Sequence, residues 1–166
     1  MGLFRRRRVE RTAAGRYRLH LPETERAVLG DLVGQLREVL VVTTDDPIVR
    51  RLFPTAYNAD AERDREYQQL VRDELLERRL AALSTVEDTL EQDELSEGEL
   101  SGWLTALNDL RLVLGTRLDV SEDPVELDLE DPDAPIYAVY EYLGFLLSEV
   151  VDAIEGALPP PSEPDL

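Results

Sequence analysis

Residues 96–118 read SEGELSGWLTALNDLRLVLGTRL, and this run carries a clear helix pattern. Ser96 and Glu99 have the spacing of a capping box, in which each side chain accepts a hydrogen bond from the other residue's backbone N–H. Beyond this cap the apolar residues recur every three or four positions, at Leu100, Trp103, Leu107, Leu110 and Leu114. Such a stripe is typical of a helix packed against a core, so we interpret Trp103 as a packing residue.

Four further helices are predicted by caps and apolar stripes. Pro22 begins the first of them and is followed by acidic residues that favour a helix N-terminus. Asp46 precedes a short helix, and Asp133 caps the last one. The long segment in the middle has apolar residues on two opposite sides, so it either kinks near residues 73–76 or contacts different partners at its two ends. The five expected helices are 22–42, 46–53, 61–90, 97–118 and 134–156.

The segment before Pro22 alternates with a period of two, which predicts a strand. Its apolar residues are Tyr17, Leu19 and Leu21, separated by Arg16, Arg18 and His20, and we interpret His20 as a solvated surface residue. Residues 4–11 are expected to pair with this strand across a turn at 12–15, where Gly15 permits positive φ. The predicted fold is therefore mainly α, a helical bundle of about five helices preceded by a short N-terminal β-hairpin.

A single domain is expected over residues 1–158. It consists of a basic hairpin arm at 1–21 and the helical bundle at 22–158. The proline-rich acidic residues 159–166 are expected to form a disordered tail.

The composition excludes several kinds of chemistry. The 166 residues include no cysteine, which rules out disulfides, thiolate metal sites and cysteine nucleophiles, and one histidine leaves little for a zinc site or a Ser-His-Asp site. No phosphate-binding glycine loop or hydrolase motif occurs, and no apolar run is long enough to cross a membrane. The acidic residues 119–133 lack the glycine of a calcium-binding loop, so we interpret them as a solvated loop. We predict a non-enzymatic protein without metal or cofactor.

Charge is distributed unevenly along the chain. All 18 basic residues are arginines; residues 1–85 have a net charge of +2 and residues 86–166 have −20, which gives −18 overall. The arginines near the N-terminus are candidates for nucleic-acid contact: Arg5, Arg6, Arg7, Arg8, Arg11, Arg16 and Arg18. The alternative, which we favour, is that this arm packs on the protein's own acidic half, around residues 119–133, or only aids solubility. Carboxylates of the same molecule compete for it at high effective concentration.

The polar run in the central helix is a further candidate for contacts. Asn108 and Arg111 lie on one flank of that helix and Asp109 lies on the other. These side chains form either a polar contact surface or, as we favour, hydrogen bonds to neighbouring helices. Arg117 falls on the apolar stripe, so its guanidinium must either reach a hydrogen-bond acceptor or project into solvent at the end of the helix.

Four segments together resemble a known family. They are residues 47–57 (PIVRRLFPTAY), 73–80 (DELLERRL), 99–118 and 140–147 (YEYLGFLL). They are similar to a small actinobacterial family, long called a domain of unknown function, whose members are described as actinomycete oxidative stress regulators. The resemblance covers nearly the whole chain up to Leu158. Its most specific run contains Trp103, Asn108, Asp109, Arg111, Gly115 and Arg117.

The resemblance implies a cytoplasmic, redox-responsive transcriptional regulator of thiol metabolism. Because this chain has no cysteine, a cysteine-based sensing mechanism does not carry over. The resemblance favours a regulator of the oxidative stress response that contacts DNA through the arginine arm or acts on the transcription machinery.

The alternative function is a protein–protein adaptor without DNA contact. The net charge of −18 favours this hypothesis, because it repels nucleic acid at long range. Tyr142 and Phe145 favour it too, since they project away from the core stripe of the last helix and form a candidate partner surface. A protein partner is expected, no membrane association is expected, and a homodimer is compatible with the sequence.

Overall fold

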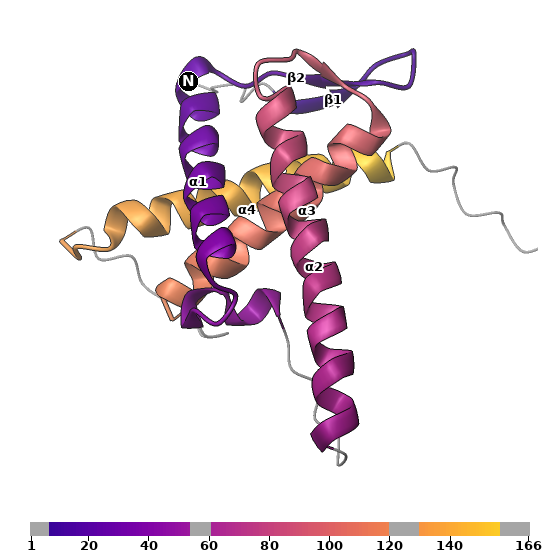
Figure 1. The fold of residues 1–166 in the computed structure, drawn as a ribbon. Coiled ribbons are helices and arrows are strands. Elements are labelled where there is room, and N and C mark those ends of the chain that lie inside the picture. Colours follow the sequence, from indigo (N-terminus) through magenta and orange to yellow (C-terminus); the bar gives the residue numbers. More distant parts are fainter. Residues whose placement is uncertain (1–6, 54–60, 120–129, 157–166) are drawn as a thin grey trace, which may run out of the picture.

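The computed structural model describes residues 7–53, 61–119 and 130–156 (Figure 1). The elements in chain order are strands β1 (Val9–Arg11) and β2 (Tyr17–Leu19), helix α1 (Glu23–Val42), the short 3₁₀ helix η1 (Pro47–Leu52), helix α2 (Ala61–Thr89), strand β3 (Glu94–Leu95) and helices α3 (Glu97–Arg117) and α4 (Ala134–Glu155). The predicted fold, a mainly helical protein with an N-terminal hairpin, is confirmed. Each expected helix is present within one residue of its predicted bounds. The predicted tail at 159–166 lies outside the described residues.

A third strand extends the hairpin into a small antiparallel sheet of order β1-β2-β3. Tyr17 pairs with Leu95 and Arg18 pairs with Glu94. Gly15 turns the hairpin with a φ of 77°, the left-handed conformation that glycine tolerates. Strand β3 was not predicted, because two residues are too few to show a period of two. The sheet lies at the end of the bundle where α1 begins (Figure 1).

Helix α3 is the centre of the packing and contacts α2, α4 and η1. Its stripe is buried as predicted at Leu100, Trp103, Leu107 and Leu110. Trp103 is 1% exposed and its indole N–H donates to Thr89 Oγ1 at 2.7 Å, which confirms it as a packing residue. Among the described residues no helix is long and apolar enough to cross a membrane.

Helix α2 is one continuous helix with different surroundings at its two ends. Its N-terminal part extends beyond the other elements in Figure 1, and Tyr67 and Leu70 are 65% and 58% exposed there. Its C-terminal part packs on the core, where Leu83 and Val86 are buried. The two-sided apolar pattern therefore reflects different surroundings along a continuous helix rather than a break in it.

The helix caps are partly as predicted. Ser96 and Glu99 form the capping box, with N···O distances of 3.2 and 2.9 Å, and Asp46 Oδ1 accepts from the Ile48 N–H at 3.0 Å. Asp133 precedes α4, but its side chain makes no capping bond. The Asp131 side chain instead accepts from the Asp133 N–H at 2.9 Å, so the capping role predicted for the Asp133 side chain is wrong.

Candidate functional site

The hairpin arginines differ in how far their charge is compensated. Arg16 and Arg18 share the carboxylate of Glu94 at 3.4 Å each. Arg7 and Arg11 are exposed, and neither has an ion-pair partner in the part of the chain that the structure describes. The remaining candidates Arg5 and Arg6 lie outside the described residues. Most of the hairpin's described basic charge is therefore directed at the protein's own carboxylates.

Arg8 anchors the hairpin to two helices. Its backbone N–H donates to Glu149 Oε2 of α4 at 2.9 Å, and its Nε donates to the Glu25 carboxylate of α1 at 3.2 Å. Arg8 therefore holds β1 over the place where α1 and α4 approach each other. The predicted docking region at 119–133 lies mostly outside the described residues, so the contact with it stays a prediction.

His20 is covered rather than solvated. Its side chain is 12% exposed and its Nε2 lies 3.1 Å from Glu10 Oε2, across the hairpin. The interpretation of His20 as a freely solvated residue is therefore corrected. The alternating pattern placed it on the outer face, but it did not show that the neighbouring strand would cover the ring.

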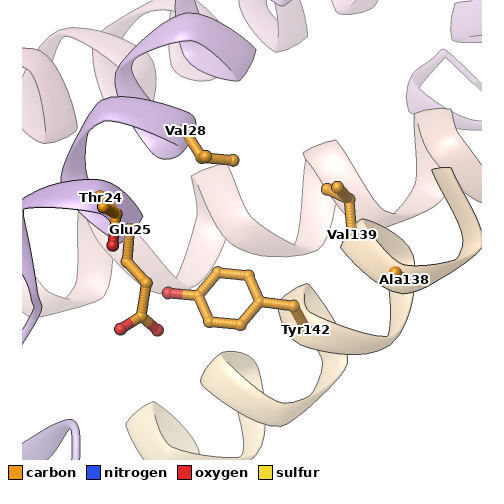
Figure 2. A pocket seen from close by; sticks show the side chains of 6 residues that line it. All are labelled: Thr24, Glu25, Val28, Ala138, Val139 and Tyr142. Atoms are coloured by element: carbon orange, nitrogen blue, oxygen red, sulfur yellow. The ribbon is translucent and has the colours of Figure 1, made fainter. Parts of the chain in front are cut away.

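A hollow of about 290 Å³ lies between α1 and α4 (Figure 2). Its lining is almost entirely apolar, and the residues come from one turn of each helix: Thr24, Glu25 and Val28 of α1, and Ala138, Val139 and Tyr142 of α4. Figure 2 shows the Tyr142 hydroxyl directed at the Glu25 carboxylate. Burial, followed by the nearby Glu25 carboxylate, raises the pKa of Tyr142 above its ordinary value. Tyr142 therefore stays neutral and presents an apolar ring with a hydroxyl at its edge.

The two aromatic residues predicted as a partner surface have different positions. Tyr142 lines the hollow, and Phe145 is half-buried one turn further along α4, outside its lining. Val28, on the opposite wall, is 41% exposed. The described surface of this region is therefore accessible and apolar, in a chain whose residues are 33% charged.

The flank of α3 that faces α2 holds a buried ion pair. Asp109 is fully buried, and its Oδ1 accepts from Arg79 Nη1 at 2.8 Å. Burial raises the pKa of Asp109 from 3.8 to about 6, although the Arg79 charge opposes the shift. Asn108 is exposed. Asp109 thus binds α3 to α2, the role that we favoured for this run.

The other flank of α3 faces α4 and η1, and among the described residues it holds no such pair. The Arg111 guanidinium carbon lies 4.9 Å from the centroid of the Tyr140 ring. A Cβ at Gly115 would lie 3.3 Å from Tyr140 Cε2 and 3.4 Å from Arg51 Nη1, so both side chains contact α3 where it has no side chain. Arg117, the last residue of α3, is exposed, so its guanidinium projects into solvent at the end of the helix.

Several residues of these sites were not predicted. Arg79, Arg51 and Glu25 lie in charged or amphipathic runs, where nothing in the spacing separates a partner of α3 or of Tyr142 from a solvated charge. Arg26 is buried as well, and its Nε donates to the Leu21 carbonyl at 3.0 Å, between the hairpin and α1. Within the described ranges no group of three or more acidic or histidine side chains is placed to hold a metal ion.

Comparison with known proteins gives a match along most of the chain. Residues 2–154 match the family described as "Domain of unknown function (DUF2017)". A protein of Mycobacterium tuberculosis (strain ATCC 25618 / H37Rv) named "Oxidative stress regulator AosR" is 29% identical over 191 residues, which cover 91% of this chain and 88% of that protein. A relative in Mycobacterium leprae (strain TN) is 27% identical over 188 residues, 89% of this chain and 87% of its own. No solved structure matches the chain.

Proposed function

Because this chain belongs to the DUF2017 family, whose match covers residues 2–154, we propose that it is a non-enzymatic regulator in the response to oxidative stress and that it acts by binding a protein partner. The regulatory part of the proposal is supported by similarity to proteins named oxidative stress regulators. The mode of action is supported by the surface of this chain. In this proposal the regulator affects transcription through contact with a component of the transcription machinery.

The hollow between α1 and α4 is the observation that carries the protein-binding part. It offers an apolar wall on each side, with Val28 on α1 and Val139 on α4, and the Tyr142 ring beside them. Exposed apolar surface of this kind, next to polar residues, is typical of protein contact sites. Glu25 at its edge supplies a polar anchor. A net charge of −18 supports a protein ligand over nucleic acid at this face.

The test uses a charge placed in the hollow and the same charge placed elsewhere on α1. Val28→Arg puts a guanidinium into the apolar wall, whereas Val42→Arg changes a residue that is 82% exposed at the far end of the same helix. Tagged wild type and both variants are used to capture partners from cells of the source organism exposed to peroxide, after circular dichroism has established that all three are folded.

We expect the wild type and Val42→Arg to retain the same specific partner and Val28→Arg to lose it. Burying an unpaired charge in an apolar contact costs several kcal/mol, which corresponds to at least about a hundredfold loss of affinity. Retention of every partner by a folded Val28→Arg variant would show that the hollow is not the contact site.

A second candidate function is DNA binding through the hairpin, and it is favoured by Arg7 and Arg11, which are exposed and have no carboxylate partner in the described part of the chain. Such contacts would neutralise phosphates without distinguishing sequences. Replacing Arg5, Arg6, Arg7 and Arg11 with alanine leaves the anchor Arg8 intact. If DNA is bound, an electrophoretic mobility shift of the wild type weakens as salt rises, and the variant loses the shift for all sequences about equally.

A further inference from the structure

The four segments that carry the family resemblance meet around α3. Arg79, from residues 73–80, pairs with Asp109 on one flank. Arg51, from residues 47–57, and Tyr140, from residues 140–147, contact the opposite flank beside Gly115. The second meeting point is separate from the hollow between α1 and α4, because none of its residues lines that hollow.

At this second point two arginine side chains approach the same flank of α3, and one of them lies over a tyrosine ring. Arg111 stacks over the Tyr140 ring with 4.9 Å between its guanidinium carbon and the ring centroid. Arg51 Nη1 and Tyr140 Cε2 both lie within 3.5 Å of the point where a Cβ of residue 115 would be. Gly144 allows the approach from the α4 side, because a Cβ there would lie 3.3 Å from Arg111 Nε. Glycines on facing helices thus allow the three side chains to gather.

Neither guanidinium has a carboxylate partner among the described residues. Acidic residues outnumber arginines by 36 to 18 in this protein, although Arg7, Arg11 and Arg117 also lack a carboxylate partner among the described residues. In the described part of the chain, seven other arginines have a carboxylate within 3.4 Å: Arg8, Arg16, Arg18, Arg26, Arg37, Arg72 and Arg79. Two cations on one flank of α3 repel each other, so a pair without a carboxylate among the described residues favours an added anion.

From this arrangement we infer that Arg51, Arg111 and the Tyr140 hydroxyl bind a phosphate group. Planar guanidinium groups match the oxygens of phosphate and donate paired hydrogen bonds to them. A phosphate monoester carries about −1.5 to −2 charges at pH 7, which matches the two arginines better than a single carboxylate does. Arg51 is exposed and Arg111 and Tyr140 are half-buried, and the buried Nε of Arg111 has no hydrogen-bond partner among the described residues.

The phosphate has two sources with the same chemistry, a free small molecule or a phosphorylated residue of a protein partner. The primary experiment titrates the full-length ¹⁵N-labelled protein with inorganic phosphate at constant ionic strength and follows the amide and arginine Nε–H signals. Acetate serves as a monoanionic control. A serine peptide and its phosphoserine form distinguish the two sources.

We expect saturable shifts at Gly115 and the neighbouring residues with phosphate and much weaker shifts with acetate. Arg51→Gln is expected to weaken phosphate binding by about tenfold or more, because one charged hydrogen-bond donor is lost. Arg78→Gln removes the same charge from an exposed residue of α2, and it is expected to bind like the wild type. Tyr140→Phe keeps the ring for Arg111 and is expected to weaken binding less than Arg51→Gln.

Tighter binding of the phosphoserine peptide than of inorganic phosphate would assign the site to a protein partner, and equal binding would assign it to a free phosphate. The inference is overturned if phosphate causes no saturable shift, or if Arg51→Gln binds phosphate as the wild type does. An equal loss in Arg78→Gln would also overturn it, since the effect would then come from net charge alone.

Discussion

The two flanks of α3 carry arginines in opposite electrostatic situations. Toward α2, Arg79 is compensated by the fully buried Asp109 at 2.8 Å. Toward α4 and η1, Arg111 lies over Tyr140 and Arg51 lies beside Gly115, and neither has a carboxylate partner among the described residues. The comparison teaches that one helix can use a short polar run both for packing and for a binding surface. On the first flank the charge of Arg79 is neutralised by Asp109, and on the second flank, as we propose, the charges of Arg51 and Arg111 are neutralised by a bound ligand.

The strongest test of the Asp109 flank is Asp109→Ala. It leaves Arg79 without its partner inside the α2–α3 contact, and such losses cost about 3–5 kcal/mol. Asn108→Ala is the matched control, because Asn108 is the exposed neighbour on the same helix. Its unfolding free energy should change by less than about 0.5 kcal/mol. Urea unfolding of both variants measures the difference, and equal stabilities would show that the ion pair does not hold the two helices together.

Asp109 on the same flank should make the free energy of unfolding depend on pH. Burial raises the pKa of Asp109 from 3.8 to about 6, so the folded protein binds this proton more tightly than the unfolded chain does. Protonated Asp109 therefore adds about 3 kcal/mol to the free energy of unfolding at low pH, and this stabilisation is lost as the pH rises from about 4 to 6. Asp109→Asn cannot titrate. Its stability relative to the wild type should therefore improve by that amount between pH 4 and pH 7.

Urea unfolding of the wild type and Asp109→Asn at four pH values measures this change. Taking the difference between the two proteins cancels the titration of the other carboxylates that the proteins share. A difference that stays constant across the range would contradict the raised pKa of Asp109.

Two glycines of α3 show that the two flanks differ in the room that they leave for an added side chain. A Cβ at Gly102 would lie 2.8 Å from Thr85 Cγ2 of α2, whereas a Cβ at Gly115 would lie no closer than 3.3 Å to Tyr140. Overpacking a helix contact costs about 1–3 kcal/mol, and both variants gain helix propensity equally. We expect Gly102→Ala to be less stable than Gly115→Ala by about 1–2 kcal/mol. Thermal unfolding of the two proteins checks this, and the opposite order would show that the α4 flank is the tighter one.

The smallest expected effects concern Arg111 and Arg117. Arg111→Ala removes the stacking on Tyr140 and should cost about 1 kcal/mol. Arg117→Ala changes an exposed residue at the helix end and should alter stability by less than about 0.5 kcal/mol. Chemical denaturation of both variants compares them. A larger loss for Arg117→Ala would place a packing role at the helix end that the structure does not show.

Much of the fold was predictable from local patterns. The capping box at Ser96 and the stripe that contains Trp103 act within one helix, so sequence spacing was enough to find them. Strand β3 was missed because its pairing with Tyr17 joins residues 78 positions apart and involves only Glu94 and Leu95. Asp133 shows a related limit, since a favourable residue at the right position does not guarantee its hydrogen bond.

The candidate sites were predictable only in part. The sequence placed Asp109 and Arg111 on opposite flanks of α3, and it drew attention to Tyr142. It did not show that Arg79 reaches Asp109, that Arg51 reaches α3 beside Gly115, or that Glu25 faces Tyr142. These contacts depend on how helices distant in sequence pack together, and no periodicity encodes which of many charged residues meets a given partner.

The most direct test of the difference between the flanks is the melting temperature of the wild type, Asp109→Asn and Arg51→Gln with and without phosphate at fixed ionic strength. Ligand at ten times its dissociation constant stabilises a folded protein by about 1.4 kcal/mol, which corresponds to a shift of about 3 °C for a chain of this size. The wild type and Asp109→Asn should both show this shift, although their melting temperatures without phosphate differ. Arg51→Gln should melt like the wild type without phosphate and, with tenfold weaker binding, show a shift of only about 1 °C at the same phosphate concentration. A full shift in Arg51→Gln, or a shift lost in Asp109→Asn alone, would contradict the division of α3 into a packing flank and a binding flank.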